Sequence, residues 1–139
     1  MKLVLDASMV LAWQFARQDA IEQACAARLR DHLADFELLA PAFLHLELAN
    51  GLLVGERRGM LTVAQAEAFL QLVDALPLVM EAISPVVQRR QVLHRARLCG
   101  LTVYGASYLD LALRTGAILA TFDRQLAAAM RAVGGKVYE

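Results

Sequence analysis

The fold is decided near the N-terminus, where residues 3–8 read LVLDAS. Residues 2–5 predict a short strand that is apolar on both faces, as in a strand buried within a parallel sheet. This strand ends on Asp6, and a helix with apolar residues from Met9 to Phe15 is expected directly after it. Asp6 has two interpretations: it caps the helix, or it faces the crevice where open α/β sheets bind ligands.

Size and composition indicate one ordinary domain, residues 1–139. The hydrophobic fraction is 58%, yet no stretch reaches the ~18 apolar residues that a membrane span needs, and Asp6 interrupts the apolar start that a signal peptide would require. We interpret the surplus apolar residues as core plus a subunit or partner interface. Cys25 and Cys99 lack metal-type spacing, so buried thiols in a reducing cytoplasm are expected.

The net charge of zero argues against a protein that coats nucleic acid by bulk charge. The arginines are nevertheless clustered, as at Arg57–Arg58, Arg89–Arg90, Arg95 and Arg97. Because arginine binds phosphate in a bidentate manner, such patches could hold RNA locally. The alternative is that they are solvated helix faces.

Short apolar strands alternate with helical patterns along the chain. Strands are expected at residues 2–5, 36–40, 78–80, 117–120 and 136–138, and helices at 9–15, 20–33, 42–54, 62–75, 84–98, 103–114 and 123–133. Thr62 and Gln65 fit a capping box, while Gly100 and Gly116 are expected to end the helices before them. This alternation predicts a three-layer α/β domain with a mainly parallel sheet of four to five short strands.

Two further acids are candidates for the same site, Glu47 within a helix and Asp123 at the end of a strand, as Asp6 is. Glu47 lies in a strongly apolar helical stretch, where an ionised carboxylate is costly unless a cation compensates it. Asp123 follows an apolar strand and opens the last helix, so it could act as a cap, as a ligand, or as both. Carboxylates that cluster at the end of parallel strands suit a hard divalent cation, Mg²⁺ or Mn²⁺.

Four segments together resemble the PIN-domain ribonucleases, in particular the VapC-type toxins of toxin–antitoxin pairs. They are VLDAS at 4–8, LELAN at 46–50, LTVY with ASYL at 101–109, and TFDRQL at 121–126. The resemblance spans nearly the whole chain and implies a PIN-like fold. It also implies a homodimer, a cognate VapB-type antitoxin, and Mg²⁺- or Mn²⁺-dependent cleavage of RNA, often tRNA, to a 5′-phosphate and a 3′-hydroxyl.

The same resemblance assigns residue roles. Asp6, Glu47 and Asp123 match acids that hold the metal and carry catalysis, and Ser8 and Thr121 match hydroxyl residues that support them by hydrogen bonds.

The chain departs from the family at Gly105, where the pattern has an aspartate directly after the tyrosine. Asp110 is the nearest acid, but five residues along a helix place it about 140° around the axis from position 105. Either the chain is a naturally weakened nuclease, or the change was selected or introduced because an active toxin kills the cell that makes it.

The function predicted from the sequence is therefore a metal-dependent endoribonuclease toxin neutralised by an antitoxin. The alternative is a catalytically weakened PIN module that acts only by binding antitoxin or RNA. A third possibility is an unrelated α/β domain whose acids are helix caps.

Overall fold

The first strand of the chain lies inside the sheet, with a neighbour on each side. In this computed structural model, which describes residues 1–139, the strand order is β3-β2-β1-β4 and all pairings are parallel. The strands are β1 (Lys2–Leu5), β2 (Glu37–Ala40), β3 (Leu78–Met80) and β4 (Ile118–Ala120). Leu3, Val4 and Leu5 have no exposed surface, which confirms the prediction of a strand apolar on both faces.

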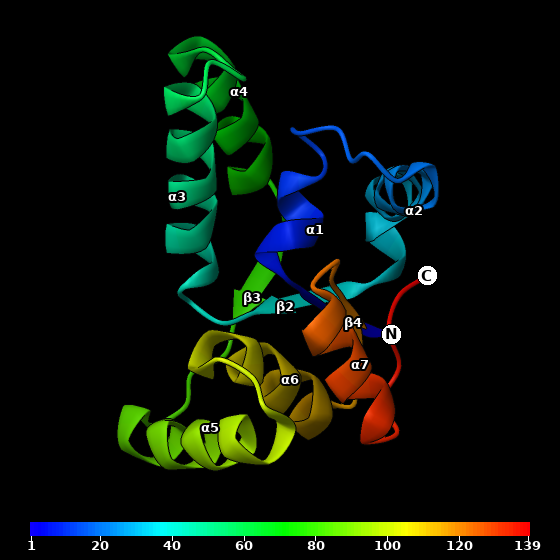
Figure 1. The fold of residues 1–139 in the computed structure, drawn as a ribbon, viewed down its shortest axis with the longest axis vertical. Coiled ribbons are helices and arrows are strands. Elements are labelled where there is room, and N and C mark those ends of the chain that lie inside the picture. The colour runs from blue at the N-terminus through cyan, green and yellow to red at the C-terminus, as the bar shows by residue number, and fades with distance from the viewer.

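Helices cover both faces of this sheet (Figure 1). They are α1 (Ala7–Leu11), α2 (Ala20–Asp31), α3 (Leu44–Arg57), α4 (Val63–Asp74), α5 (Pro85–Cys99), α6 (Val103–Thr115) and α7 (Arg124–Ala132), with a short 3-10 turn η1 (Leu33–Asp35). Helices α1 to α4 lie on one side, whereas α6 packs under β1 and β4 on the other and is itself covered by α5. The three-layer α/β architecture with a parallel central sheet is therefore confirmed.

Several helix ends follow the predicted local signals. Thr62 and Gln65 exchange both hydrogen bonds of a capping box at the start of α4. Gly100 and Gly116 end α5 and α6 in the left-handed conformation, with φ of 65° and 68°. Glycine adopts this conformation without the steric penalty that a Cβ would bring.

Two expected elements are shorter than predicted. Helix α1 ends at Leu11 rather than near Phe15, because Trp13 and Gln14 close tighter turns onto Val10 and Leu11 and the Trp13 indole N–H donates to Ala26 O of α2 at 2.9 Å. The strand expected at 136–138 is reduced to one parallel bridge between Val137 and Leu119 of β4. None of the helices has the length and apolarity needed to cross a membrane.

Candidate active site

The register of β1 and β4 brings two polar residues together at the carboxyl edge of the sheet. Leu5 pairs with Ala120, so the residues that follow, Asp6 and Thr121, are neighbours. The Asp6 backbone N–H extends the ladder by donating to Ala120 O at 3.0 Å. This is the edge of open parallel sheets at which ligands bind.

Two hydroxyl groups orient the Asp6 carboxylate. Ser8 Oγ and Thr121 Oγ1 each donate to Asp6 Oδ2 at 2.6 Å. The hydroxyls are fixed in turn by backbone donors, since Phe122 N–H donates to Ser8 Oγ at 2.9 Å and Asp123 N–H to Thr121 Oγ1 at 3.0 Å. Both hydroxyl bonds converge on Oδ2 and leave Oδ1 without a side-chain donor.

Asp6 does not act as a helix cap. It occupies the N-cap position of α1, but its side chain makes no capping hydrogen bond. Burial raises the pKa of this carboxyl, the Ser8 and Thr121 hydroxyls and the Ala7 N–H oppose that rise, and the charge of Asp123 adds to it. A buried acid held by hydroxyls, without a cationic partner, is a typical feature of functional sites.

Asp123 combines capping with exposure toward the same edge. Its Oδ1 accepts from Leu126 N–H at 3.1 Å at the start of α7. The carboxylate is exposed and lies close enough to Asp6 to raise the pKa of the Asp6 carboxyl. The capping interpretation therefore holds for Asp123 and does not remove it from the site.

Glu47 of α3 reaches the site through a tyrosine of α6. Tyr108 Oη donates to Glu47 Oε1 at 2.6 Å, and Tyr108 is almost wholly buried. Burial raises the pKa of Glu47, the Tyr108 hydrogen bond opposes that rise, and the negative charge of Asp6 adds to it. Burial, together with the charge of Asp6 and the bond to Glu47, also raises the pKa of Tyr108, so its hydroxyl stays a donor.

Position 105 lies in the first turn of α6 and carries no side chain. The Gly105 N–H donates to Thr102 Oγ1 at 3.0 Å, and a Cβ placed there would meet only Thr102 Oγ1 at 3.4 Å and Leu101 Cβ at 3.8 Å. Those distances are ordinary van der Waals contacts, and the φ of Gly105 is not positive. The local structure would therefore accept a Cβ at this position.

Asp110 lies elsewhere. It is buried between α5 and α6, where Arg95 Nε donates to Oδ1 at 3.2 Å and Arg114 Nε to Oδ2 at 2.7 Å. Both of its oxygens are thus occupied, as expected from its rotation away from position 105.

The donor set is chemically suited to a hard cation. Asp6, Glu47 and Asp123 offer oxygen ligands. Burial raises the pKa of Asp6 and of Glu47, the charge of Asp123 adds to the rise at Asp6, and the charge of Asp6 adds to the rise at Glu47. A divalent ion would relieve this repulsion. No three acidic, histidine or cysteine side chains are gathered tightly enough to hold a metal ion by themselves.

Comparison with known proteins shows which family the chain belongs to. No protein-family model matches the chain. The chain is 32% identical over 127 residues to ribonuclease VapC3 of Pyrobaculum aerophilum, covering 91% of this chain and 93% of that protein. The chain belongs to the VapC-type PIN-domain ribonuclease family.

Two solved structures have folds similar to that of this VapC-type chain. PAE2754 from Pyrobaculum aerophilum has a TM-score of 0.67 at 27% identity, covering 93% of this chain and 86% of that one. FitAcB from Neisseria gonorrhoeae shares the fold, with a TM-score of 0.64 at 14% identity over 99% of this chain and 96% of that one.

Two features of this VapC-type site were not anticipated from the sequence. The first is Tyr108, which lies one helical turn after Gly105, although i to i+3 spacing on one face of a helix could have suggested it. The second is Arg17, whose guanidinium lies 4.8 Å from the centre of the Phe122 ring. No local pattern connects two residues so far apart in the chain.

Proposed function

We propose that this chain is an endoribonuclease toxin that uses Mg²⁺ or Mn²⁺ and is neutralised by a VapB-type antitoxin. The observation that carries the proposal is the Asp6 carboxylate, buried at the end of β1, oriented by Ser8 and Thr121, and accompanied by Glu47 and Asp123. The relationship to ribonuclease VapC3 supports RNA as the substrate.

In this proposal Asp6, Glu47 and Asp123 are the residues that would hold the metal. When bound, the ion would activate a water molecule and neutralise charge on the phosphodiester oxygens. The other residues act by positioning: Ser8 and Thr121 fix the plane of the Asp6 carboxylate, and Tyr108 fixes Glu47. The buried side of the site limits the solvent that surrounds these charges, which strengthens their interactions.

The proposal has a second part, which concerns Gly105: the chain with glycine at this position cleaves RNA slowly. A missing ligand lowers metal occupancy and misplaces the attacked phosphate, and catalysis is sensitive to small misplacements. The weakened PIN module that only binds antitoxin or RNA is the competing function, and the absent side chain at position 105 is the observation in its favour.

Substitution at position 105 tests both functions. Gly105→Asp should cleave RNA in Mn²⁺ on the order of a hundredfold faster than the unmodified chain, and it should be toxic when produced without antitoxin. Gly105→Asn is the matched control, because it adds a side chain of the same shape without the negative charge and should remain slow.

Rates should be compared after circular dichroism has shown equal folding of the three proteins. Equal cleavage by the unmodified chain and Gly105→Asp would show that position 105 is not a ligand position. Complete inactivity of all three would favour the binding module over the nuclease.

A further inference from the structure

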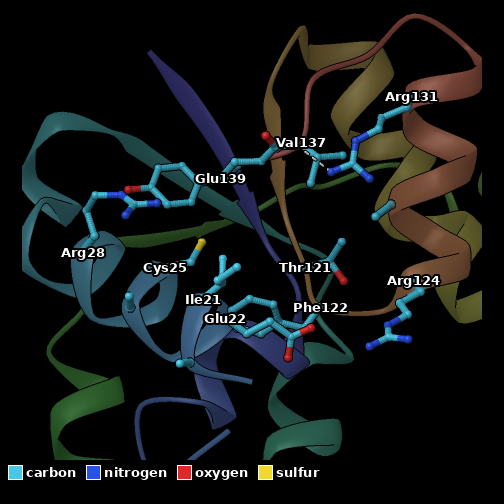
Figure 2. A pocket seen from close by; sticks show the side chains of 14 residues that line it. Ile21, Glu22, Cys25, Arg28, Thr121, Phe122, Arg124, Arg131, Val137 and Glu139 are labelled. Carbon is cyan, nitrogen blue, oxygen red and sulfur yellow. Dashed lines mark hydrogen bonds and ion pairs between the residues drawn. The ribbon is translucent and has the colours of Figure 1, made fainter. Parts of the chain in front are cut away.

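A hollow of about 580 Å³ opens between α2 and α7, beside the candidate active site (Figure 2). Ile21, Glu22 and Cys25 line it from α2, and Thr121 and Phe122 lie between the two helices. The segment around Val137 closes the remaining side. Its lining is therefore mixed, with an apolar floor and a charged rim.

The hollow shares a wall with the acids. Thr121 lines it and also donates to Asp6 Oδ2 at 2.6 Å. Phe122 and Arg124 line it too, and Asp123 stands between them in the chain. The hollow therefore adjoins the acids directly.

Arginines face one another across the rim. Arg28 projects from α2, and Arg124 and Arg131 project from α7 (Figure 2). Arg131 pairs with Glu139 at 2.7 Å, but Arg28 and Arg124 make no salt bridge in the structure. Two exposed guanidinium groups are thus free for an anionic partner.

The acids of the rim do not compensate these two groups, because each already has a partner. Glu22 pairs with Arg17 at 2.9 Å, just as Glu139 pairs with Arg131. The rim therefore keeps a positive excess next to a site that itself carries three acids.

Aromatic rings complete the lining. The Phe122 ring lies 4.8 Å from the Arg17 guanidinium, and the Tyr138 ring lies 5.9 Å from that of Arg28. Tyr138 is also held edge-on by Phe36, with ring centres 6.0 Å apart. Aromatic rings and arginine guanidinium groups are both surfaces on which unpaired nucleobases stack.

We propose that this hollow binds an unpaired nucleotide of the RNA substrate, next to the phosphate held at the acids. Its base contacts the rings of Phe122 and Tyr138, and its flanking phosphates contact Arg28 and Arg124. The unpaired arginines and the wall shared with the acids favour RNA over a protein segment. The inference rests on the proposed ribonuclease function and adds the residues of this chain that contact the RNA beside the acids.

Binding without cleavage tests the inference. The probe is a fluorescein-labelled, mixed-sequence single-stranded RNA of about ten nucleotides, measured by fluorescence anisotropy in EDTA between about 50 and 200 mM salt. Arg28→Gln with Arg124→Gln should weaken binding on the order of tenfold and reduce the salt slope by about 1.4, for two lost phosphate contacts.

The control pair is Arg57→Gln with Arg58→Gln, which makes the same charge change at two exposed positions at the end of α3, away from the hollow. We interpret these two arginines as a solvated helix face rather than as an RNA patch. It should leave both the affinity and the salt slope unchanged. Tyr138→Leu should weaken binding about tenfold through lost stacking, whereas Tyr138→Phe should retain it. A duplex of the same sequence should bind less tightly than the single strand.

Undiminished RNA affinity in the Arg28/Arg124 variant would overturn the inference, and cleavage by Gly105→Asp would then show that the proposed function still stands. Absence of RNA binding by the unmodified chain, together with absence of cleavage by Gly105→Asp, would overturn both. If the variant binds RNA normally but no longer co-purifies with its cognate antitoxin, the hollow receives a protein segment and the RNA assignment is wrong.

Discussion

At the scale of single residues, the Asp6 carboxylate lowers the stability of the fold at a position that we propose binds the metal. Burial raises its pKa above the value in the unfolded chain. The ionised form is therefore disfavoured in the folded protein, so Asp6 costs stability at neutral pH, and this cost disappears as the pH falls through the folded pKa.

Asp6→Asn should accordingly stabilise the protein in EDTA. We expect a Tm higher by about 3 °C at pH 7, with the difference shrinking toward acidic pH, as measured by differential scanning calorimetry. A lower Tm at pH 7 would mean that the two hydroxyl bonds to Oδ2 outweigh the burial of the charge.

The same substitution should remove metal binding. With one ligand already missing at position 105, the unmodified chain should bind Mn²⁺ weakly by isothermal titration, and Asp6→Asn should abolish that signal. Tight binding that survives Asp6→Asn would show that these acids do not form the metal site.

Tyr108 is the second residue with a testable role. In a Gly105→Asp background, Tyr108→Phe should lower kcat about tenfold, since ligand-orienting groups typically have effects of that size, and should raise the Mn²⁺ concentration needed for half-maximal rate. The KM for RNA should change little, because the hydroxyl binds Glu47. Tyr104→Phe, on an exposed tyrosine of the same helix, is the control and should leave kcat and the Mn²⁺ requirement unchanged.

Residues of the site differ in how far they could be predicted. Asp6, Ser8, Thr121 and Asp123 follow the ends of two apolar strands, and parallel strands end at one edge of the sheet, so a shared edge could be inferred. That β1 and β4 are direct neighbours is known only from the structure. Tyr108 could not be inferred in the same way, because its partner lies 61 residues earlier on another helix.

At the scale of elements, α5 joins the molecule through α6. Val92, Ala96 and Ala106 form a small apolar cluster separate from the main core. The buried Asp110 adds ion pairs from α6 to Arg95 of α5 and, within α6, to Arg114. Removing one member of such a cluster leaves buried charge without compensation.

Asp110→Asn should therefore destabilise the protein by about 2 kcal/mol in urea denaturation, somewhat below the usual cost of a broken buried pair because both arginines are partly exposed. Asp31→Asn, which removes an exposed pair with Arg30, should change stability by less than about 0.5 kcal/mol. RNA cleavage per folded molecule should be unaffected in a Gly105→Asp background, and its loss would place Asp110 in the site after all.

Element boundaries were predictable where capping chemistry is local, as at Thr62 and Gly116. They were not predictable where contacts with other elements set the end of a helix. The end of α1 is the clearest case, because the Trp13 indole N–H donates to a backbone carbonyl of α2. The order of the strands was also hidden, since strands apolar on both faces carry no pattern that distinguishes their neighbours.

At the scale of the whole molecule, large apolar side chains remain exposed on several helices. Leu46 and Leu72 lie on α3 and α4 with 75% and 69% of their surface exposed. Val86 and Val103, near the starts of α5 and α6, are 56% and 48% exposed. Where exposed apolar side chains form a contiguous patch, the patch marks a site of association.

We expect the chain to form a homodimer through such helix faces, with apolar surface remaining for an antitoxin segment. Multi-angle light scattering at micromolar concentration should give about twice the chain mass of 15.2 kDa, and dilution should reveal the monomer only at lower concentration. A monomer throughout the micromolar range would contradict the prediction.

The room around Gly105 has an evolutionary consequence. Nothing in the packing or the backbone of α6 requires glycine there, since a Cβ fits at ordinary contact distances. A glycine codon that ends in a pyrimidine becomes an aspartate codon by a single transition, without a compensating change elsewhere in the gene. On our proposal, a lineage that carries this chain with such a codon is one point mutation away from a lethal gene, and only the continued presence of its antitoxin makes that mutation survivable.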